Sequence, residues 1–65
     1  MIKLTYIEDG EQCEEIFPDR AALEEDLADN ASAEYTALVL NAIDSGMNPV
    51  TVFNGFTRDT YTVIE

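Results

Sequence analysis

Histidine is absent from this chain of 65 residues, and cysteine occurs only once, at Cys13. Without histidine there is no Ser-His or Cys-His pair for nucleophilic catalysis, and a single cysteine allows neither an internal disulfide framework nor a zinc site built from cysteines. Two acids, Glu14 and Glu15, follow Cys13, whereas reactive cysteines occur in electropositive surroundings. We interpret Cys13 as a small core residue and predict that the protein is not an enzyme.

Basic residues are also scarce. The chain has three, Lys3, Arg20 and Arg58, against fourteen aspartates and glutamates, so its formal net charge is −11. Such a chain repels phosphate, which argues against direct binding to nucleic acid or to anionic membranes. The longest apolar, charge-free run of helical character, residues 35–43, is far shorter than the ~20 residues of a membrane span. Met1 is not followed by a basic and then an apolar leader, so we expect a soluble cytoplasmic protein without a secretory signal.

The length of the chain limits its core. Residues 1–65 are enough for a single domain, and a domain of this size buries only about 60% of the surface of its unfolded chain. The hydrophobic fraction of 46% and the six aromatic residues nevertheless exceed what a disordered acidic tail carries. We therefore expect one folded domain with little stability to spare.

The first segment is typical of a β-hairpin. Residues 2–7 alternate apolar and polar side chains, as a half-buried strand does, and the Asp9-Gly10 pair favours a two-residue turn of type I′. Glu15 then falls on the apolar side of the second strand, which leaves open a bulge or fraying near it. The hairpin is predicted to place Ile2, Leu4, Tyr6, Cys13 and Phe17 on its core face, and Lys3, Thr5, Gln12 and Glu14 on the other.

Two helices are predicted next. The first covers about residues 19–29, with Pro18 in its first turn or Asp19 as its N-cap, and its Leu23 and Leu27 point together. Asn30 and Ser32 separate it from a second helix over about residues 33–45, which Gly46 ends in the C′ position. Leu40 of the second helix does not belong to the apolar stripe expected to be buried, and two contacts are open for it, with the first helix or with a partner. That stripe is predicted to consist of Tyr35, Leu38, Val39, Ala42 and Ile43.

Two further strands are predicted over residues 50–53 and 60–64. Asn54-Gly55 is a good hairpin turn, but a wider loop through residues 56–59 or a turn at Arg58-Asp59 fits equally well. The order of elements is ββααββ, which predicts an α+β fold in which an antiparallel sheet is covered on one face by a two-helix hairpin.

Acidic residues are concentrated in one part of the chain. Residues 8–34 hold eleven of the fourteen acids and a single base, Arg20, so this segment has a net charge of −10. Ordinary solvated helix faces interleave lysine with glutamate, so that residues four apart attract each other. Here only Arg20 and Glu24 form such an attractive pair. Asp29 is repelled by both Glu25 and Asp26. Asp26 and Asp29 also lie at the C-terminal end of the helix, where the helix dipole disfavours negative charge. Such uncompensated costs are expected at functional sites.

Salt adaptation and metal binding account for these acids less well. Adaptation to high salt should spread acids over the whole surface, yet residues 35–64 contain only Asp44 and Asp59. Calcium prefers six to eight oxygens, commonly on a longer loop of alternating Asp and Asn. The segment from Glu8 to Glu11 is too short to supply them, and the helix acids diverge. We therefore predict no specific metal site and no cofactor.

The remaining interpretation is imitation of phosphates. Carboxylates three or four residues apart on a helix lie about 5–6 Å from each other, which resembles the spacing of neighbouring phosphates on a nucleic-acid strand. A basic nucleic-acid-binding surface would then be the partner, attracted rapidly and in a salt-dependent manner. The predicted partner-binding residues are Glu24, Glu25, Asp26 and Asp29 as the main row, with Glu8, Asp9, Glu11, Glu14 and Glu15 as its flank.

The aromatic residues of the C-terminal part leave a second hypothesis open. Phe53, Phe56 and Tyr61 are most simply core residues or cross-strand pairs. If Phe53 and Phe56 instead flank an exposed turn, they could anchor a protein contact or the edge of a homodimer. The protein would then be a small non-catalytic interaction or regulatory module, such as an antitoxin or an assembly subunit.

The chain resembles small phage-encoded mimics of nucleic acid, especially anti-CRISPR and antirestriction proteins, in its size, its acidity and its mixture of strands and helices. The acids of residues 8–29 carry this resemblance. The resemblance is one of general character. It implies a CRISPR effector complex or another DNA-handling enzyme as the target, blocked at its DNA-binding site in the cytoplasm of the host cell.

Overall fold

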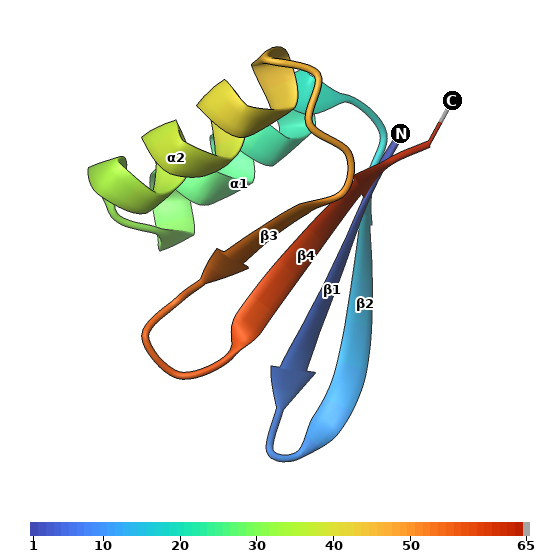
Figure 1. Cartoon of the computed structure of the whole chain (residues 1–65), viewed down its shortest axis with the longest axis vertical. Coiled ribbons are helices and arrows are strands. Elements are labelled where there is room, and N and C mark those ends of the chain that lie inside the picture. Colours follow the sequence, from blue (N-terminus) through green and yellow to red (C-terminus); the bar gives the residue numbers. More distant parts are fainter. Residues whose placement is uncertain (65) are drawn as a thin grey trace.

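The computed structural model describes residues 1–64, which form a four-stranded antiparallel sheet with two helices on one side of it (Figure 1). The order of elements along the chain is ββααββ and the order of strands in the sheet is β2-β1-β4-β3, so the predicted α+β fold is confirmed. Neither of the two helices in residues 1–64 has the length and apolar character needed to cross a membrane. The elements are β1 (Ile2–Glu8), β2 (Glu11–Phe17), α1 (Arg20–Asn30), α2 (Ala33–Asp44), β3 (Val50–Phe53) and β4 (Arg58–Val63).

The β1–β2 hairpin has the predicted turn. Asp9 and Gly10 both have positive φ, 52° and 79°, as a type I′ turn requires. The bulge or fraying that the sequence left open near Glu15 does not occur. The pairing continues without interruption, and Leu4 lies opposite Glu15. Since β2 is an edge strand, the Glu15 side chain reaches solvent without disturbing the ladder. The confirmed partners include Ile2 with Phe17, Tyr6 with Cys13, and Glu8 with Glu11.

The core face of this hairpin is shorter than predicted. Ile2 and Phe17 are buried, at 3% and 7% exposure, and Leu4 packs against the core from its edge. Tyr6 and Cys13, which were expected in the core, are only half-buried. The reason is visible in Figure 1, where the turn end of the hairpin extends beyond the part of the sheet that the helices cover.

Both helices begin and end with satisfied backbone groups. The Asp19 side chain accepts a hydrogen bond from the Ala22 backbone N–H at 2.8 Å, so Asp19 is the N-cap of α1. Ser32 caps α2 in the same way, through Tyr35. At the C-terminus of α2, Gly46 has a φ of +92°. Its N–H and that of Met47 donate back to the carbonyls of Ile43 and Ala42, which is a Schellman motif, so the predicted C′ position of Gly46 is confirmed.

The buried face of α2 is rotated from the predicted stripe. Leu38, which was expected in the core, is 57% exposed, and Leu40, which lay off the stripe, is buried at 7%. Because α2 packs against α1 as well as against the sheet, its buried face turns toward α1 and takes in Leu40. The core consists of Ile2, Phe17, Leu23, Leu27, Val39, Leu40, Val50, Val52 and Tyr61.

The last hairpin resolves the alternatives left open by the sequence. Strand β4 begins at Arg58, two residues earlier than expected, and Phe53 pairs with Arg58. The connection is a loop of residues 54–57, closed by a hydrogen bond from the Asn54 N–H to the Thr57 carbonyl at 3.0 Å. It is therefore neither a two-residue turn at Asn54-Gly55 nor a turn at Arg58-Asp59.

The core assignment can be tested with two leucines. Leu23→Ala should lower the free energy of unfolding by about 2–5 kcal/mol, because it leaves a cavity at a fully buried site. Leu38→Ala should change it by less than about 0.5 kcal/mol, because that side chain faces solvent. Urea denaturation followed by circular dichroism measures both values. Equal losses in the two variants would contradict the rotated face of α2.

Candidate functional site

The nine acids predicted to bind a partner all belong to α1 or to the β1–β2 hairpin. We call these nine residues the acidic flank, because α1 packs against β2 at the same edge of the molecule. Eight of them are exposed and Asp26 is half-buried. They are Glu8, Asp9, Glu11, Glu14, Glu15, Glu24, Glu25, Asp26 and Asp29.

The structure divides these residues among several directions. At 100° per residue, Asp26 lies only about 60° from the buried Leu23, which explains its partial burial. It therefore does not join Glu25 and Asp29 on the outer face of α1, and its carboxylate accepts a hydrogen bond from the Asn30 amide at 3.2 Å. The predicted single row of four carboxylates is thus an outer pair, Glu25 and Asp29, with Asp26 on one side of it and Glu24, which contacts Arg20, on the other.

The strand acids alternate between the two faces of the sheet. Glu15 lies opposite Leu4, on the face that carries the helices, and Glu14 lies opposite Thr5, on the open face. Glu8 and Glu11 are directly opposite each other across the turn end of the hairpin. Charged side chains on an edge strand also discourage pairing with another sheet, which gives the β2 acids a structural role as well. The α1 acids have no such role.

The single base of the acidic segment is used elsewhere. Arg20 forms two hydrogen bonds of 2.7 Å to the carboxylate of Asp44 on α2, and its contact with Glu24 is longer, at 3.4 Å. The bidentate contact lowers the pKa of Asp44. Sequence reasoning found Glu24 through its spacing but missed Asp44, which is 24 residues away. Within residues 1–64, Glu24 is the only member of the acidic flank in an ion pair.

A different kind of surface lies at the opposite edge. Phe53 on the edge strand β3 is 65% exposed, Phe56 in the following loop is 92% exposed, and Leu38 on the neighbouring α2 is 57% exposed. We call these three residues the apolar flank. The interpretation of Phe53 and Phe56 as core residues is wrong, while Tyr61 is buried as expected, at 2% exposure. Buried and exposed residues alternate along β3, so Phe53, which follows the buried Val52, points away from the core.

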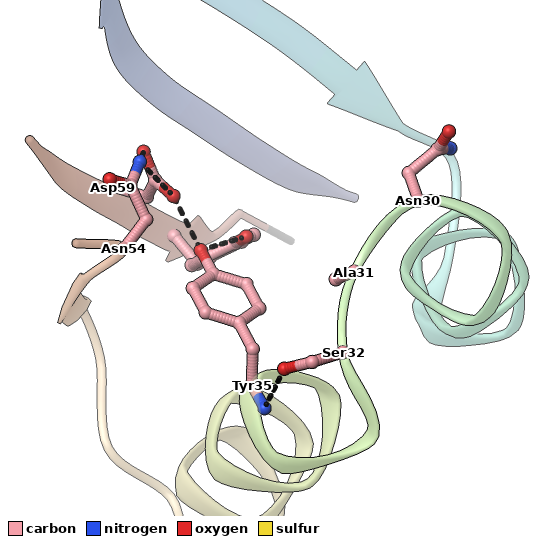
Figure 2. A pocket seen from close by; sticks show the side chains of 7 residues that line it. Asn30, Ala31, Ser32, Tyr35, Asn54 and Asp59 are labelled. Carbon is pink, nitrogen blue, oxygen red and sulfur yellow. Dashed lines mark hydrogen bonds between the residues drawn. The ribbon is translucent and has the colours of Figure 1, made fainter. Parts of the chain in front are cut away.

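Between the two flanks lies a pocket that sequence reasoning missed. It has a volume of about 320 Å³ and opens between the α1–α2 turn and the start of β4 (Figure 2). Asp59, only 9% exposed, is the buried polar residue of its wall. No single segment of the sequence signals the pocket, because its residues come from three separate parts of the chain. They are Asn30, Ala31, Ser32, Tyr35, Asn54, Asp59 and Tyr61.

A hydrogen-bond network holds the wall of the pocket in place. The Tyr35 hydroxyl donates to the Asp59 carboxylate at 2.5 Å and lies 2.8 Å from the Tyr61 hydroxyl. The Asn54 amide donates to both Asp59 oxygens at 3.1 Å. The Asn54 side-chain oxygen in turn accepts from the backbone N–H groups of Phe56 and Thr57, so the network orders the β3–β4 loop.

The two tyrosines of the network hold their protons firmly. Burial raises the pKa of Tyr61 to about 12, and the nearby carboxylates of Asp59, Asp26 and Glu15 add to this effect. Burial, and then the hydrogen bond to Asp59, raises the pKa of Tyr35 even further. Both hydroxyls are therefore neutral donors near pH 7 and do not act as bases. Within residues 1–64, no three side chains drawn from the acids and Cys13 converge on a point where a metal ion could be held.

Comparison of the chain with protein families, with curated proteins and with solved structures finds no match. Its function is therefore inferred from its own side chains.

The tyrosine network makes a prediction at alkaline pH. Since the pKa of Tyr61 is about 12 in the folded state and about 10 in an unfolded chain, the folded state retains a proton that the unfolded state loses between these values. The stabilising contribution is therefore complete below about pH 10 and is lost as the pH rises toward 12. Tyr61→Phe should make the free energy of unfolding fall less steeply over this range, as measured in urea. Tyr6→Phe, outside the network, should keep most of the loss, and identical slopes in the two variants would contradict the assignment.

Proposed function

We propose that this protein is a non-catalytic, acidic DNA-mimic inhibitor, which binds the basic nucleic-acid-binding surface of a target protein and blocks access of DNA to it. A CRISPR effector complex is a target of the required kind, and the site of action is the cytoplasm, that of the host cell if the protein is phage-encoded. The observation that carries the proposal is the unneutralised charge of the acidic flank. Apart from Glu24 and Asp26, the seven other residues of the flank are exposed and form no ion pair in the described part of the chain, residues 1–64.

The outer pair on α1 is central to this proposal. Glu25 and Asp29 are four residues apart on an exposed helix face, so their Cβ atoms lie about 5–6 Å from each other and their carboxylates repel. Asp29 also lies in the last turn of α1, which contains no basic residue, so the helix dipole disfavours it as well. A cationic groove on a partner would relieve both effects at once. The charge of the flank would also steer the partner toward it and make association salt-dependent.

The direct test is reversal of the outer pair. Glu25→Lys combined with Asp29→Lys should weaken association with the captured target by at least about tenfold, mainly through a slower on-rate, since four units of charge are changed. The single variants Glu25→Lys and Glu34→Lys form a matched comparison, because Glu34 is exposed on α2 and lies outside the acidic flank. Binding is measured by surface plasmon resonance at several salt concentrations.

The target is first obtained by capture from a host lysate on the immobilised protein, in the presence and absence of duplex DNA. DNA should displace the captured protein, and higher salt should reduce its capture. Capture that is indifferent to both DNA and salt, or an equal effect of Glu25→Lys and Glu34→Lys, would refute the mimic function.

A second candidate function is favoured by the exposure of the apolar flank. Two phenylalanines and a leucine that leave more than half of their surface to solvent are a cost for a small monomer. Leu38 and Phe53 line one shallow groove, next to the free edge of β3. The protein would then be an interaction or regulatory module, such as an antitoxin or assembly subunit, or would form a homodimer through this edge.

This second function predicts a different pattern of variants. Phe53→Ser combined with Leu38→Ser should abolish partner binding or dimerisation if the apolar flank is the contact, because aromatic anchors carry most of an interface's binding energy. The same pair should leave the binding of a DNA-competed target within about threefold of the original. Sedimentation velocity measures the oligomeric state, and the capture experiment measures the partner. The two double variants thus separate the two functions.

A further inference from the structure

The pocket contains a buried carboxylate without a positive partner. The donors to Asp59 are the Tyr35 hydroxyl and the Asn54 amide, and both are neutral groups. Within residues 1–64, the ion pairs of the protein are those of Arg20 with Glu24 and Asp44, so no base lies within salt-bridge distance of Asp59. A carboxylate accepts about four hydrogen bonds and Asp59 receives three. A further donor, especially a cationic one, can therefore be accommodated.

The surroundings of the pocket favour a positive charge over any other ligand. Tyr35, which is half-buried, contributes an aromatic ring to the lining, and the faces of such rings attract cations. The carboxylates of Asp59, Asp26 and Glu15 all help to raise the pKa of Tyr61, which is consistent with a negative electrostatic potential at the pocket. An anion would be repelled. A divalent metal ion would find only one carboxylate in the lining, although such ions prefer several.

The size of the pocket limits the ligand further. A volume of about 320 Å³ is at the lower end of small-molecule sites. This volume is sufficient for one extended side chain with a planar head group. A guanidinium group combines several donors with a flat surface that stacks on aromatic rings, whereas an ammonium group is a compact, more strongly hydrated charge.

We propose that this pocket receives the guanidinium group of an arginine side chain from the basic partner, held by Asp59 and stacked against the half-buried Tyr35. The proposal rests on the proposed function, because a nucleic-acid-binding surface supplies exposed arginines. The acidic flank then attracts the partner over a long range, and the pocket fixes its register at one point. An arginine enters a preformed site, since the network already holds Asp59 in place.

The test uses two probes and no partner protein. Agmatine carries the guanidinium on a free amine, and N-acetyl-glycyl-arginyl-glycinamide carries it on a peptide. Each is titrated into the ¹⁵N-labelled protein and followed by amide chemical shifts. Saturating shifts are expected at Ser32 and at the Asn30 and Asn54 side chains, which line the pocket. Ala31→Leu, which narrows the pocket, and Asp59→Asn, which removes its charge, should each weaken binding by at least about tenfold.

Matched controls separate the pocket from general charge and from added bulk. Glu25→Gln removes the same charge as Asp59→Asn, but from the exposed face of α1, and Ala21→Leu adds the same bulk at an exposed site outside the pocket. Both should bind the peptide within about twofold of the original protein. If Asp59→Asn does not fold, Ala31→Leu decides alone.

Shifts that spread over the acidic flank without saturating would overturn the proposal, as would equal binding by the pocket variants and their controls. Agmatine binding more than about tenfold tighter than the peptide would overturn the assignment to a partner side chain, because it would indicate a site for free amines. Failure of these titrations leaves the capture experiment unaffected. Failure of the capture experiment does not alter the titrations, so the two proposals are tested separately.

Discussion

The bidentate ion pair between Arg20 and Asp44 decides how much charge the rest of the molecule must tolerate. Arg20 is the only base between Glu8 and Glu34, and its two short hydrogen bonds join the start of α1 to the end of α2. Arg20 engages an acid outside the acidic flank, and within residues 1–64 neither Glu25, Asp29 nor the hairpin acids form an ion pair. The pair that links the two helices therefore leaves this surface strongly negative.

The small core imposes a second constraint, which produces two unlike edges. Two short helices cover only part of the sheet, so the turn end of the β1–β2 hairpin and the free edge of β3 remain uncovered. One uncovered edge is acidic and the other exposes Phe53 and Phe56. Charge opposes desolvation at an apolar contact, so the separation of the two kinds of side chain would allow each edge, under the proposed functions, to contact a different kind of surface.

A hydrogen-bond network joins Asp59, Tyr35, Tyr61 and Asn54. It ties the β3–β4 loop to α2 and lines a pocket that opens beside the end of α1. A buried carboxylate with only neutral donors costs stability unless it is well satisfied. Its three hydrogen bonds meet that requirement in the free protein, and the remaining acceptor position is what a cationic partner would fill.

Local rules were enough for much of this protein. The alternation of residues 2–7, the Asp9-Gly10 turn, the caps at Asp19 and Ser32 and the stop at Gly46 depend on neighbours within a few residues. The sequence by itself therefore determined the elements, the register of the β1–β2 hairpin and the excess of acid in residues 8–34. Only the tertiary structure decided which face of α2 is buried, that Arg20 prefers Asp44, and that Tyr35, Asn54 and Asp59 form a pocket. Each of these depends on packing between segments distant in the chain, and neither helical periodicity nor the spacing of charges contains that information.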